Sequence, residues 1–207
     1  MNIAVTGGMG SGKSSVTAEL AKRLDATMLN ADHICRDLLQ PGCKGLVALQ
    51  QVAPDACFLE DGSLNRPQLR KAIFADKILR KQVDSVIHPL VRKEIHSHCK
   101  LAETGGASMV VEIPLLFETA WQGDFDCTLL VYASDEVCVE RIMQRDQVDE
   151  KAAHLSIAAQ IPIQEKVQLA DFLVDNSGSF AETLDQIEYL IAKGCFLEKT
   201  KMTMNNT

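Results

Sequence analysis

The sequence predicts a three-layer α/β fold with a mainly parallel sheet of five strands. Two observations support this prediction. Short apolar runs of strand length alternate with helical patterns, and the first run ends in a loop of the form G-x-x-x-x-G-K-S. Such short, apolar runs are typical of strands that are buried on both faces of a parallel sheet. The runs are Ile3 to Thr6, Thr27 to Asn30, Met109 to Ile113, Cys127 to Ala133 and Phe172 to Asp175.

The loop from Gly7 to Ser14 has the composition of a phosphate-binding site. Its glycines let the backbone turn N–H groups around phosphate oxygens, while Lys13 supplies a mobile cation and Ser14 a hydroxyl that can ligate magnesium. The alternative is a glycine-rich turn that binds nothing, but a strand before the loop and a helix after it favour the phosphate site. The expected nucleotide-binding residues are Gly8, Met9, Gly10, Ser11, Gly12, Lys13, Ser14 and Ser15.

Helical patterns follow the strands, as an α/β fold requires. They cover Lys13 to Leu24, about Asp135 to Arg145 with Ser134 as the N-cap, and about Phe180 to Ala192. Ligands of such folds bind outside the carboxyl ends of the strands, and the loop beginning at Gly7 lies at one of these ends.

Two stretches interrupt the alternation. Residues 32–101 contain no convincing strand, so we expect a helical insertion whose segments are separated at Pro41-Gly42, Pro54, Asp61-Gly62 and Pro67. A second candidate insertion is residues 141–164, where charged residues and Pro162 precede the last strand. The tail from 197 to 207 is polar and is expected to fray.

Composition limits the classes of function. The chain has 207 residues, 46% of them hydrophobic, which suffices for one substantial core. A net charge of −7 disfavours a surface for nucleic acid, and no apolar run approaches the length of a membrane span. Seven scattered cysteines, without a C-x-x-C pair, indicate reduced thiols in a cytoplasmic protein, with Cys127 and Cys138 in the core. We therefore expect a cytoplasmic protein with a small-molecule substrate and no nucleic-acid or membrane partner; the oligomeric state is left open.

Asp32 is the best candidate for the acid that meets a phosphoryl acceptor. It closes the second strand-like run, at the sheet end where the phosphate loop also lies. A carboxylate there can orient an acceptor hydroxyl and accept its proton. Alternatively, Asp32 caps the helix that begins around His33. Residue pattern alone leaves both interpretations open.

Arg141 and Arg145 stand four residues apart in a predicted helix and therefore share one face. Two guanidinium groups on a mobile segment suit a lid that closes over a triphosphate. The alternative is an ordinary solvated helix in which the two arginines pair with Glu140, Asp146 or Asp149.

The segment Glu112 to Glu118 follows a strand-like run. Its apolar centre, which includes Leu115, could line a pocket for an organic substrate, and Glu112 could hold magnesium through water. The alternative is a strand exit with a proline turn. His88-Pro89 is similarly ambiguous, because a lone histidine is more often a packed or surface residue than a catalytic one.

Taken in order, these pieces resemble the dephospho-coenzyme A kinases of the P-loop kinase superfamily. The resemblance extends roughly from Ile3 to Leu190. It is carried by Thr6 to Ser14, Ala31-Asp32, Asp61-Gly62 with Arg66, Phe74, His88-Pro89, Pro114 to Glu118, Arg141 with Arg145, Gln160, and Ala170 to Asn176. The later motifs, in this order and at this spacing, are much more specific than the phosphate loop alone.

The resemblance implies a P-loop kinase fold and transfer of the ATP γ-phosphoryl group to the ribose 3′-hydroxyl of dephospho-coenzyme A. This reaction gives coenzyme A and ADP, is the last step of coenzyme A biosynthesis, and uses Mg²⁺. The implied organisation is a single domain over 1–207, with a nucleotide core at about 1–31, 102–140 and 165–195, a helical substrate lobe at about 32–101 and a lid at about 141–164. The implied roles are the base for Asp32, lid cations for Arg141 and Arg145, an adenine neighbour for Asn176, and substrate contacts for Arg66, His88, Pro89 and Leu115.

The chain departs from the family pattern at two places. Family members commonly have Asp-Ala-Asp where this chain has Asn30-Ala31-Asp32, which leaves Asp32 to act more nearly alone. An arginine often begins the run that ends at the lid glutamine, but this chain has Ser156 there, before Gln160. Rival interpretations are another small-molecule kinase, for a nucleoside or nucleotide, and a nucleotide-dependent switch.

Overall fold

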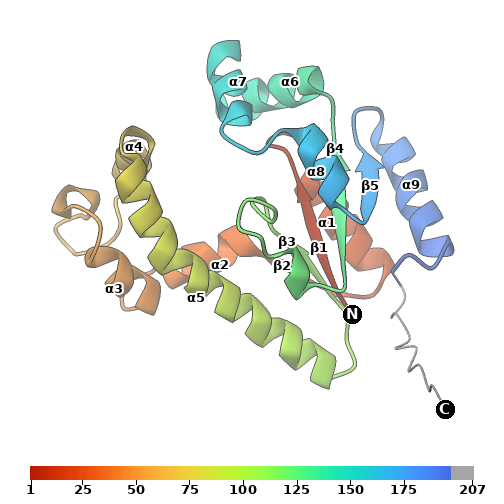
Figure 1. The fold of residues 1–207 in the computed structure, drawn as a ribbon, viewed down its shortest axis with the longest axis horizontal. Coiled ribbons are helices and arrows are strands. Elements are labelled where there is room, and N and C mark those ends of the chain that lie inside the picture. The colour runs from red at the N-terminus through yellow and green to blue at the C-terminus, as the bar shows by residue number, and fades with distance from the viewer. Residues whose placement is uncertain (197–207) are drawn as a thin grey trace. The chain divides into compact units, whose positions relative to one another are not determined.

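The computed structural model describes residues 1–196 and contains a sheet of five strands (Figure 1). The predicted polar tail at 197–207 lies outside the described residues. The strands are β1 (Asn2–Gly7), β2 (Thr27–Asn30), β3 (Met109–Glu112), β4 (Cys127–Tyr132) and β5 (Phe172–Asp175). Their spatial order is β2-β3-β1-β4-β5. The pairs β1–β3, β1–β4 and β4–β5 are parallel.

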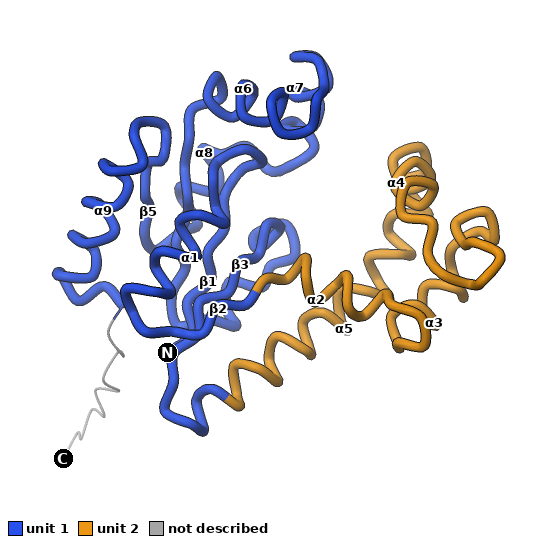
Figure 2. Tube along the Cα trace, turned by 180° about the vertical axis from the view of Figure 1, so that it is seen from behind, with its two compact units in different colours: residues 1–29, 102–207 blue, residues 30–101 orange. Residues whose placement is uncertain are grey.

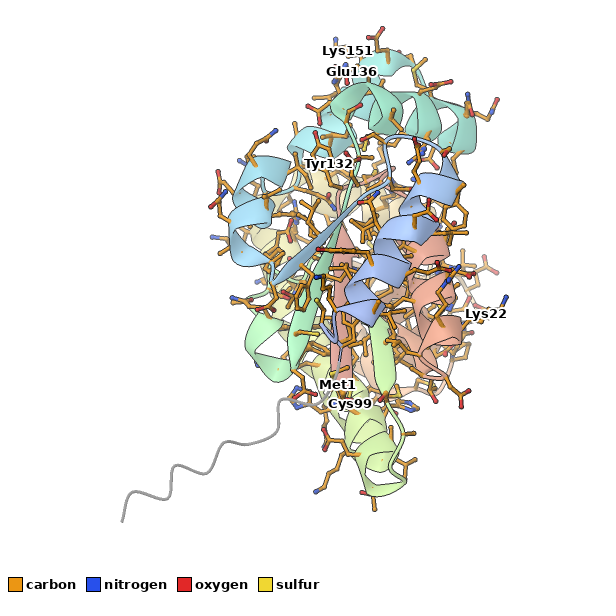
Figure 3. All side chains as sticks on the ribbon, turned by 90° about the vertical axis from the view of Figure 1, so that its right-hand side faces the viewer. Met1, Lys22, Cys99, Tyr132, Glu136 and Lys151 are labelled. Atoms are coloured by element: carbon orange, nitrogen blue, oxygen red, sulfur yellow. The ribbon has the colours of Figure 1, made fainter. Side chains whose placement is uncertain are left out.

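The register brings the carboxyl ends of the strands to one edge of the sheet. Val5 of β1 pairs with Glu112 of β3, and Gly7 pairs with Val131 of β4. In Figure 3, Tyr132 at the end of β4 lies toward one end of the sheet and Met1 toward the other. This edge is where ligands bind in open α/β sheets.

Contact analysis divides the chain into two compact units, which we describe separately (Figure 2). Among the described residues, the first unit comprises 1–29 and 102–196. Its helices among the described residues are α1 (Lys13–Arg23), α6 (Asp135–Asp146), α7 (Glu150–Ala158), α8 (Ile163–Leu169) and α9 (Phe180–Ala192). The predicted strands and the three predicted helices are confirmed, with ends that differ by no more than one residue. Ser134 is confirmed as the N-cap of α6, since its side chain accepts from the N–H of Val137.

The core of this unit lies between the sheet and two helices. Val16 and Leu20 of α1 and Ile187 of α9 are fully buried against β1, β3, β4 and β5. Helix α8 contacts β4 on the opposite face of the sheet (Figure 3). Burial of side chains this size stabilises the folded state by about 1.5–3 kcal/mol each. The predicted three-layer fold is therefore confirmed.

The second unit, residues 30–101, is helical, apart from an isolated bridge between Phe58 and Leu64. It contains α2 (Ala31–Leu38), α3 (Lys44–Gln50), α4 (Arg66–Ala75) and most of α5 (Lys77–Thr104). Every fourth residue from Leu79 to Ile95 is buried, which gives α5 one apolar face. Pro67 lies in the first turn of α4, where a missing N–H is tolerated. Pro89 lies inside α5, which continues past it.

None of the helices within residues 1–196 has the length and apolar character needed to cross a membrane.

Candidate active site

The phosphate loop joins β1 to α1 at the carboxyl edge of the sheet. Gly10 and Gly12 have φ angles of 80° and 84°, in the left-handed region that favours glycine. A Cβ atom at Gly10 would lie 2.6 Å from the carbonyl oxygen of Cys138, and one at Gly12 would overlap the side-chain amide of Asn176. The glycines are therefore required both by backbone conformation and by close neighbours.

Side chains from two other elements hold this loop in place. The amide nitrogen of Asn176, which follows β5, donates to the carbonyl oxygen of Ser11 at 2.7 Å. Arg141 Nη2 of α6 donates to the carbonyl oxygen of Asn176 at 3.0 Å, and Arg141 Nη1 to that of Gly10 at 3.4 Å. Asn176 is only 4% exposed, and its amide oxygen accepts from the hydroxyl of Thr183 at 2.8 Å. In this structure Asn176 and Arg141 thus bind the loop itself.

Lys13 and Ser14 lie at the start of α1, as the motif predicts. Lys13 Nζ donates to the carbonyl oxygen of Gly8 at 2.8 Å, which folds the amine back over the loop. Ser14 Oγ donates to Glu112 Oε1 at 2.9 Å. The sequence left Glu112 open between a magnesium role and a simple strand exit, and the structure brings it to the loop serine.

The residues around Ser14 are suited to a divalent cation. Glu112 is 4% exposed, and within residues 1–196 its Oε2 atom is buried without a hydrogen-bond partner. Buried carboxylate oxygens need a partner, and Mg²⁺ prefers oxygen ligands. No cluster of three or more His, Cys, Asp or Glu residues in the described part of the chain forms a separate metal site. A cation here would therefore depend on Ser14, Glu112, water and phosphate oxygens.

Arg145 is placed differently from Arg141. Its guanidinium group makes two contacts of 2.8 Å with the carboxylate of Asp146, and its side chain is 60% exposed. This is one of the pairings expected of a solvated helix. The two arginines share a helix face, but in this structure only Arg141 contacts the phosphate loop.

In the helical unit, Asp32 is an exposed residue of the first turn of α2. The alternative interpretation, in which Asp32 caps this helix, is wrong, because Asn30 is the N-cap. The Asn30 side-chain oxygen accepts from the backbone N–H groups of Asp32 at 2.9 Å and His33 at 3.1 Å. Asn and Asp cap about equally well, so the capping position at Asn30 tolerates this departure from the family pattern.

The other predicted substrate contacts are spread over both units. Arg66 is exposed at the start of α4, and its Nη2 donates to the carbonyl oxygen of Arg36 at 3.3 Å. His88 and Pro89 lie within α5, where His88 Nε2 is 3.6 Å from an Asp84 carboxylate oxygen. Leu115 belongs to the first unit, is half-buried, and lies in the turn after β3.

A cavity of about 450 Å³ adjoins the phosphate loop in the first unit. Gly8, Met9 and Ser11 form its loop side. Gln160 and Ile163, from the turn between α7 and α8 and the start of α8, form another side. Cys138 also lines it, and burial raises the pKa of its thiol, as expected of a packed cysteine. Cys127 and Cys138 are both buried, which confirms their predicted core positions.

Sequence reasoning missed two contacts of the turn between α7 and α8, and a third that Glu118 makes with α8. Gln160 Oε1 accepts from the N–H of Met9 at 3.1 Å, and Glu118 Oε1 accepts from the N–H of Ile161 at 3.2 Å. The same Glu118 oxygen lies 2.6 Å from Nζ of the fully buried Lys166. Gln160 and Glu118 belonged to quoted motifs, but a lysine in a short polar helix carries no signal of burial.

Comparison with known proteins identifies the family. The sequence matches the family model of dephospho-CoA kinases (CoaE) over residues 1–182. A dephospho-CoA kinase of Desulfotalea psychrophila is 38% identical over 192 residues, covering 93% of this chain and 96% of that protein.

Solved structures of similar fold cover most of the chain. TT1252 from Thermus thermophilus has a TM-score of 0.79 at 31% identity, covering 93% of this chain and 97% of that one. A dephospho-CoA kinase from Campylobacter jejuni has a TM-score of 0.66 at 26% identity, covering 93% and 96%. A shikimate kinase from Acinetobacter baumannii, at 17% identity and a TM-score of 0.54 over 95% of both chains, shares the fold. With a phosphate loop braced at the carboxyl edge of a parallel sheet and matches over most of its length, this chain belongs to the dephospho-CoA kinase family of P-loop kinases.

Proposed function

We propose that this protein transfers the γ-phosphoryl group of ATP to the ribose 3′-hydroxyl of dephospho-coenzyme A, producing coenzyme A and ADP. The observation that carries the proposal is the phosphate loop, whose Ser14 hydroxyl is hydrogen-bonded to the buried Glu112. Family membership supplies the acceptor. Seven scattered cysteines without a C-x-x-C pair support a reducing compartment, which we take to be the cytoplasm.

The donor side binds and neutralises the triphosphate. The loop's N–H groups and the N-terminus of α1 attract the phosphate oxygens, while Lys13 moves from the Gly8 carbonyl to the outer phosphates. Ser14 and Glu112 are the residues that would hold Mg²⁺, directly or through water. When bound, Mg²⁺ supplies positive charge to the β- and γ-phosphate oxygens.

The acceptor side orients the attacking hydroxyl. Asp32 has an exposed carboxylate that the helix cap does not use, so it is available to position the 3′-hydroxyl and accept its proton. Arg66, His88, Pro89 and Leu115 are the proposed substrate contacts. Phosphoryl transfer has a loose transition state, so alignment and charge contribute more than base strength.

Residues 141–164, which include the end of α6, all of α7 and the start of α8, form the proposed lid. Of the two lid arginines, Arg141 already contacts the loop through the carbonyl oxygens of Gly10 and Ser11. Arg145 has to leave Asp146 before it can assist. Two guanidinium groups brought over the phosphates would offset the charge that develops in the transition state.

The test is ADP release with ATP and Mg²⁺, with and without dephospho-coenzyme A. We expect turnover that depends on this acceptor, and phosphorus NMR should place the new phosphate on the ribose 3′-oxygen. Turnover without an acceptor would indicate a nucleotide-dependent switch. Turnover that requires a nucleoside instead would indicate a different small-molecule kinase.

A further inference from the structure

Lys166 is the largest side chain that is fully buried in the described residues, although a lysine is rarely found there. It lies on α8, and its Nζ atom is 2.6 Å from Glu118 Oε1 in the turn after β3. Taking both charges out of water is costly, and such pairs often contribute little to net stability. A role beyond stability is therefore worth testing at this pair.

Glu118 also reaches the chain segment that contacts the phosphate loop. The oxygen that pairs with Lys166 accepts from the backbone N–H of Ile161 at 3.2 Å. The preceding residue, Gln160, accepts from the N–H of Met9 at 3.1 Å. A continuous series of contacts thus links the turn after β3, the turn between α7 and α8, and the phosphate loop.

Met9 is also held through its side chain. It packs against the cluster of Val139, Ile142 and Ala153, which joins α6 to α7, together with Ile157 near the end of α7. Because Met9 lies between Gly8 and Gly10, its position affects the neighbouring backbone N–H groups of the loop. Adjacent glycines give this segment little stiffness of its own, so an external support has a larger effect.

We propose that Glu118 is a positioning residue for nucleotide binding. It fixes the backbone at Ile161, and Gln160 in turn fixes the N–H of Met9 and the shape of the phosphate loop. Lys166 neutralises the carboxylate, so that Glu118 stays at the turn instead of moving to water. This inference rests on the proposed kinase function, because it concerns the affinity for ATP.

Two double variants separate the hydrogen bond from the ion pair. Glu118→Gln with Lys166→Met removes both charges but keeps an amide oxygen that can accept from Ile161. Glu118→Leu with Lys166→Met removes both charges and the acceptor. Replacing a buried ion pair by neutral groups of similar volume is often tolerated, so both variants should fold. Their thermal midpoints are measured first.

The measured quantities are KM for ATP, KM for the acceptor, kcat, and the affinity of a fluorescent ATP analogue without acceptor. The variant with Glu118→Gln and Lys166→Met (the Gln/Met variant) should keep the parent values within about twofold. The variant with Glu118→Leu and Lys166→Met is called the Leu/Met variant. The Leu/Met variant should show a roughly three- to tenfold rise in KM for ATP and the same loss of analogue affinity, with KM for the acceptor unchanged, because one hydrogen bond is lost. Equal ATP affinity in both variants would overturn the proposal.

Gln160→Leu provides a second route to the same answer. Gln160 is only partly buried, so this change should preserve folding while raising KM for ATP by a similar roughly three- to tenfold factor. When Gln160→Leu is combined with the Leu/Met variant, KM for ATP should rise little further, because both changes break the same series of contacts to the phosphate loop. Fully additive effects would contradict the series of contacts.

Asp126→Ala, which removes a side-chain acceptor, is the matched stability control. Asp126 accepts from the backbone N–H of Asn2 at 2.7 Å, near the start of β1 and at the sheet end opposite the loop. It should lower the thermal midpoint without changing KM for ATP. The parent enzyme is assayed in parallel, and absence of acceptor-dependent turnover there would contradict the kinase function. Even in that case, a loss of ATP-analogue affinity that occurs in the Leu/Met variant but not in the Gln/Met variant would support the positioning role of Glu118.

Discussion

The phosphate loop, proposed to bind ATP, and the residues of the helical unit proposed to bind the acceptor differ in how the rest of the fold holds them. Side chains of Asn176, Arg141 and Glu112 reach the loop or its first helical turn from three other elements. In the helical unit, Asp32 and Arg66 are exposed, and the contacts found for them are with nearby residues of that unit. The loop proposed to hold the triphosphate is mostly half-buried and is fixed by side chains from other elements. Asp32 and Arg66, the residues proposed to meet the acceptor, are exposed, so we expect them to contribute little to folding.

This difference predicts which substitutions separate activity from stability. Substitution of a residue proposed to meet the acceptor should lower activity without lowering the free energy of unfolding. Substitution of a residue that braces the loop should lower both ATP binding and the free energy of unfolding. Four substitutions test the contrast.

Lys13→Ala should have the largest effect. Removing a cation from the transferred phosphate should lower kcat by roughly a thousandfold, by analogy with the loss of a donor to developing negative charge. Steady-state kinetics with saturating ATP measures this change. Lys22→Ala, on the exposed side of the same helix, is the control and should leave kcat intact (Figure 3). A Lys13→Ala enzyme at the parent rate would exclude the proposed donor site.

Asp32→Asn should lower kcat by roughly a hundredfold, because the amide cannot accept the hydroxyl proton. The thermal midpoint should stay the same, since Asp32 is exposed and the helix is capped by Asn30. Asp37→Asn, also exposed on α2, should change neither quantity. Full activity of Asp32→Asn would remove Asp32 as base or orienting group.

Asn176→Ala should lower stability and nucleotide binding together. It leaves the Ser11 carbonyl and the Thr183 hydroxyl without their Asn176 contacts, at a cost of about 1–3 kcal/mol in the free energy of unfolding. KM for ATP should rise as the loop loosens. Urea unfolding and kinetics measure the two effects.

Asn65→Ala serves as the control in the helical unit. Asn65 caps α4 by accepting from Gln68, so its loss should cost about 1 kcal/mol without changing KM for ATP. An Asn176→Ala enzyme with the stability loss but normal ATP affinity would break the link between bracing and binding.

Ser179→Ala should have the smallest effect. It removes the capping box at the start of α9, which should lower the thermal midpoint by about 2–4 °C and leave the kinetics unchanged.

Calorimetry of the Ser179→Ala variant and the parent at several pH values sharpens the test. Hydrogen bonds from the Ser179 backbone and side chain hold the pKa of Glu182 below its usual value. The stabilising contribution is therefore present above that usual pKa and lost as the pH falls through the lowered one. The difference between variant and parent should shrink in acid, and a difference that grows in acid would contradict this sign.

Local patterns in the sequence predicted much of the fold and the donor site. The strand ends, the loop glycines and the Ser134 cap follow from hydrophobic period and capping chemistry, which act over a few residues. Sequence alone could not distinguish capping by Asn30 from capping by Asp32. Both residue types cap helices well, and which of them is the cap depends on a two-residue difference in where the helix begins.

The contacts of Arg141 and Arg145 show what local sequence patterns cannot predict. The two side chains have the same chemistry and share a helix face, yet one contacts carbonyl groups of the loop and the other pairs with Asp146. The choice depends on which backbone lies within reach of each guanidinium group. That distance is set by where α6 lies relative to the loop carbonyls of Gly10 and Ser11, 131 and 130 positions earlier in the chain, and to Asn176, 35 positions later.

The sequence by itself determined the class of fold, the phosphate loop and the family, because these depend on local periodicity and on motifs with fixed spacing. The tertiary structure decided that Glu112 meets Ser14, that Asn176 braces Ser11, and that Lys166 is buried beside Glu118. Each of these contacts joins residues that are distant in the chain. Charge and hydrogen-bonding capacity are properties of a residue, but burial and partners arise only when the whole chain has folded.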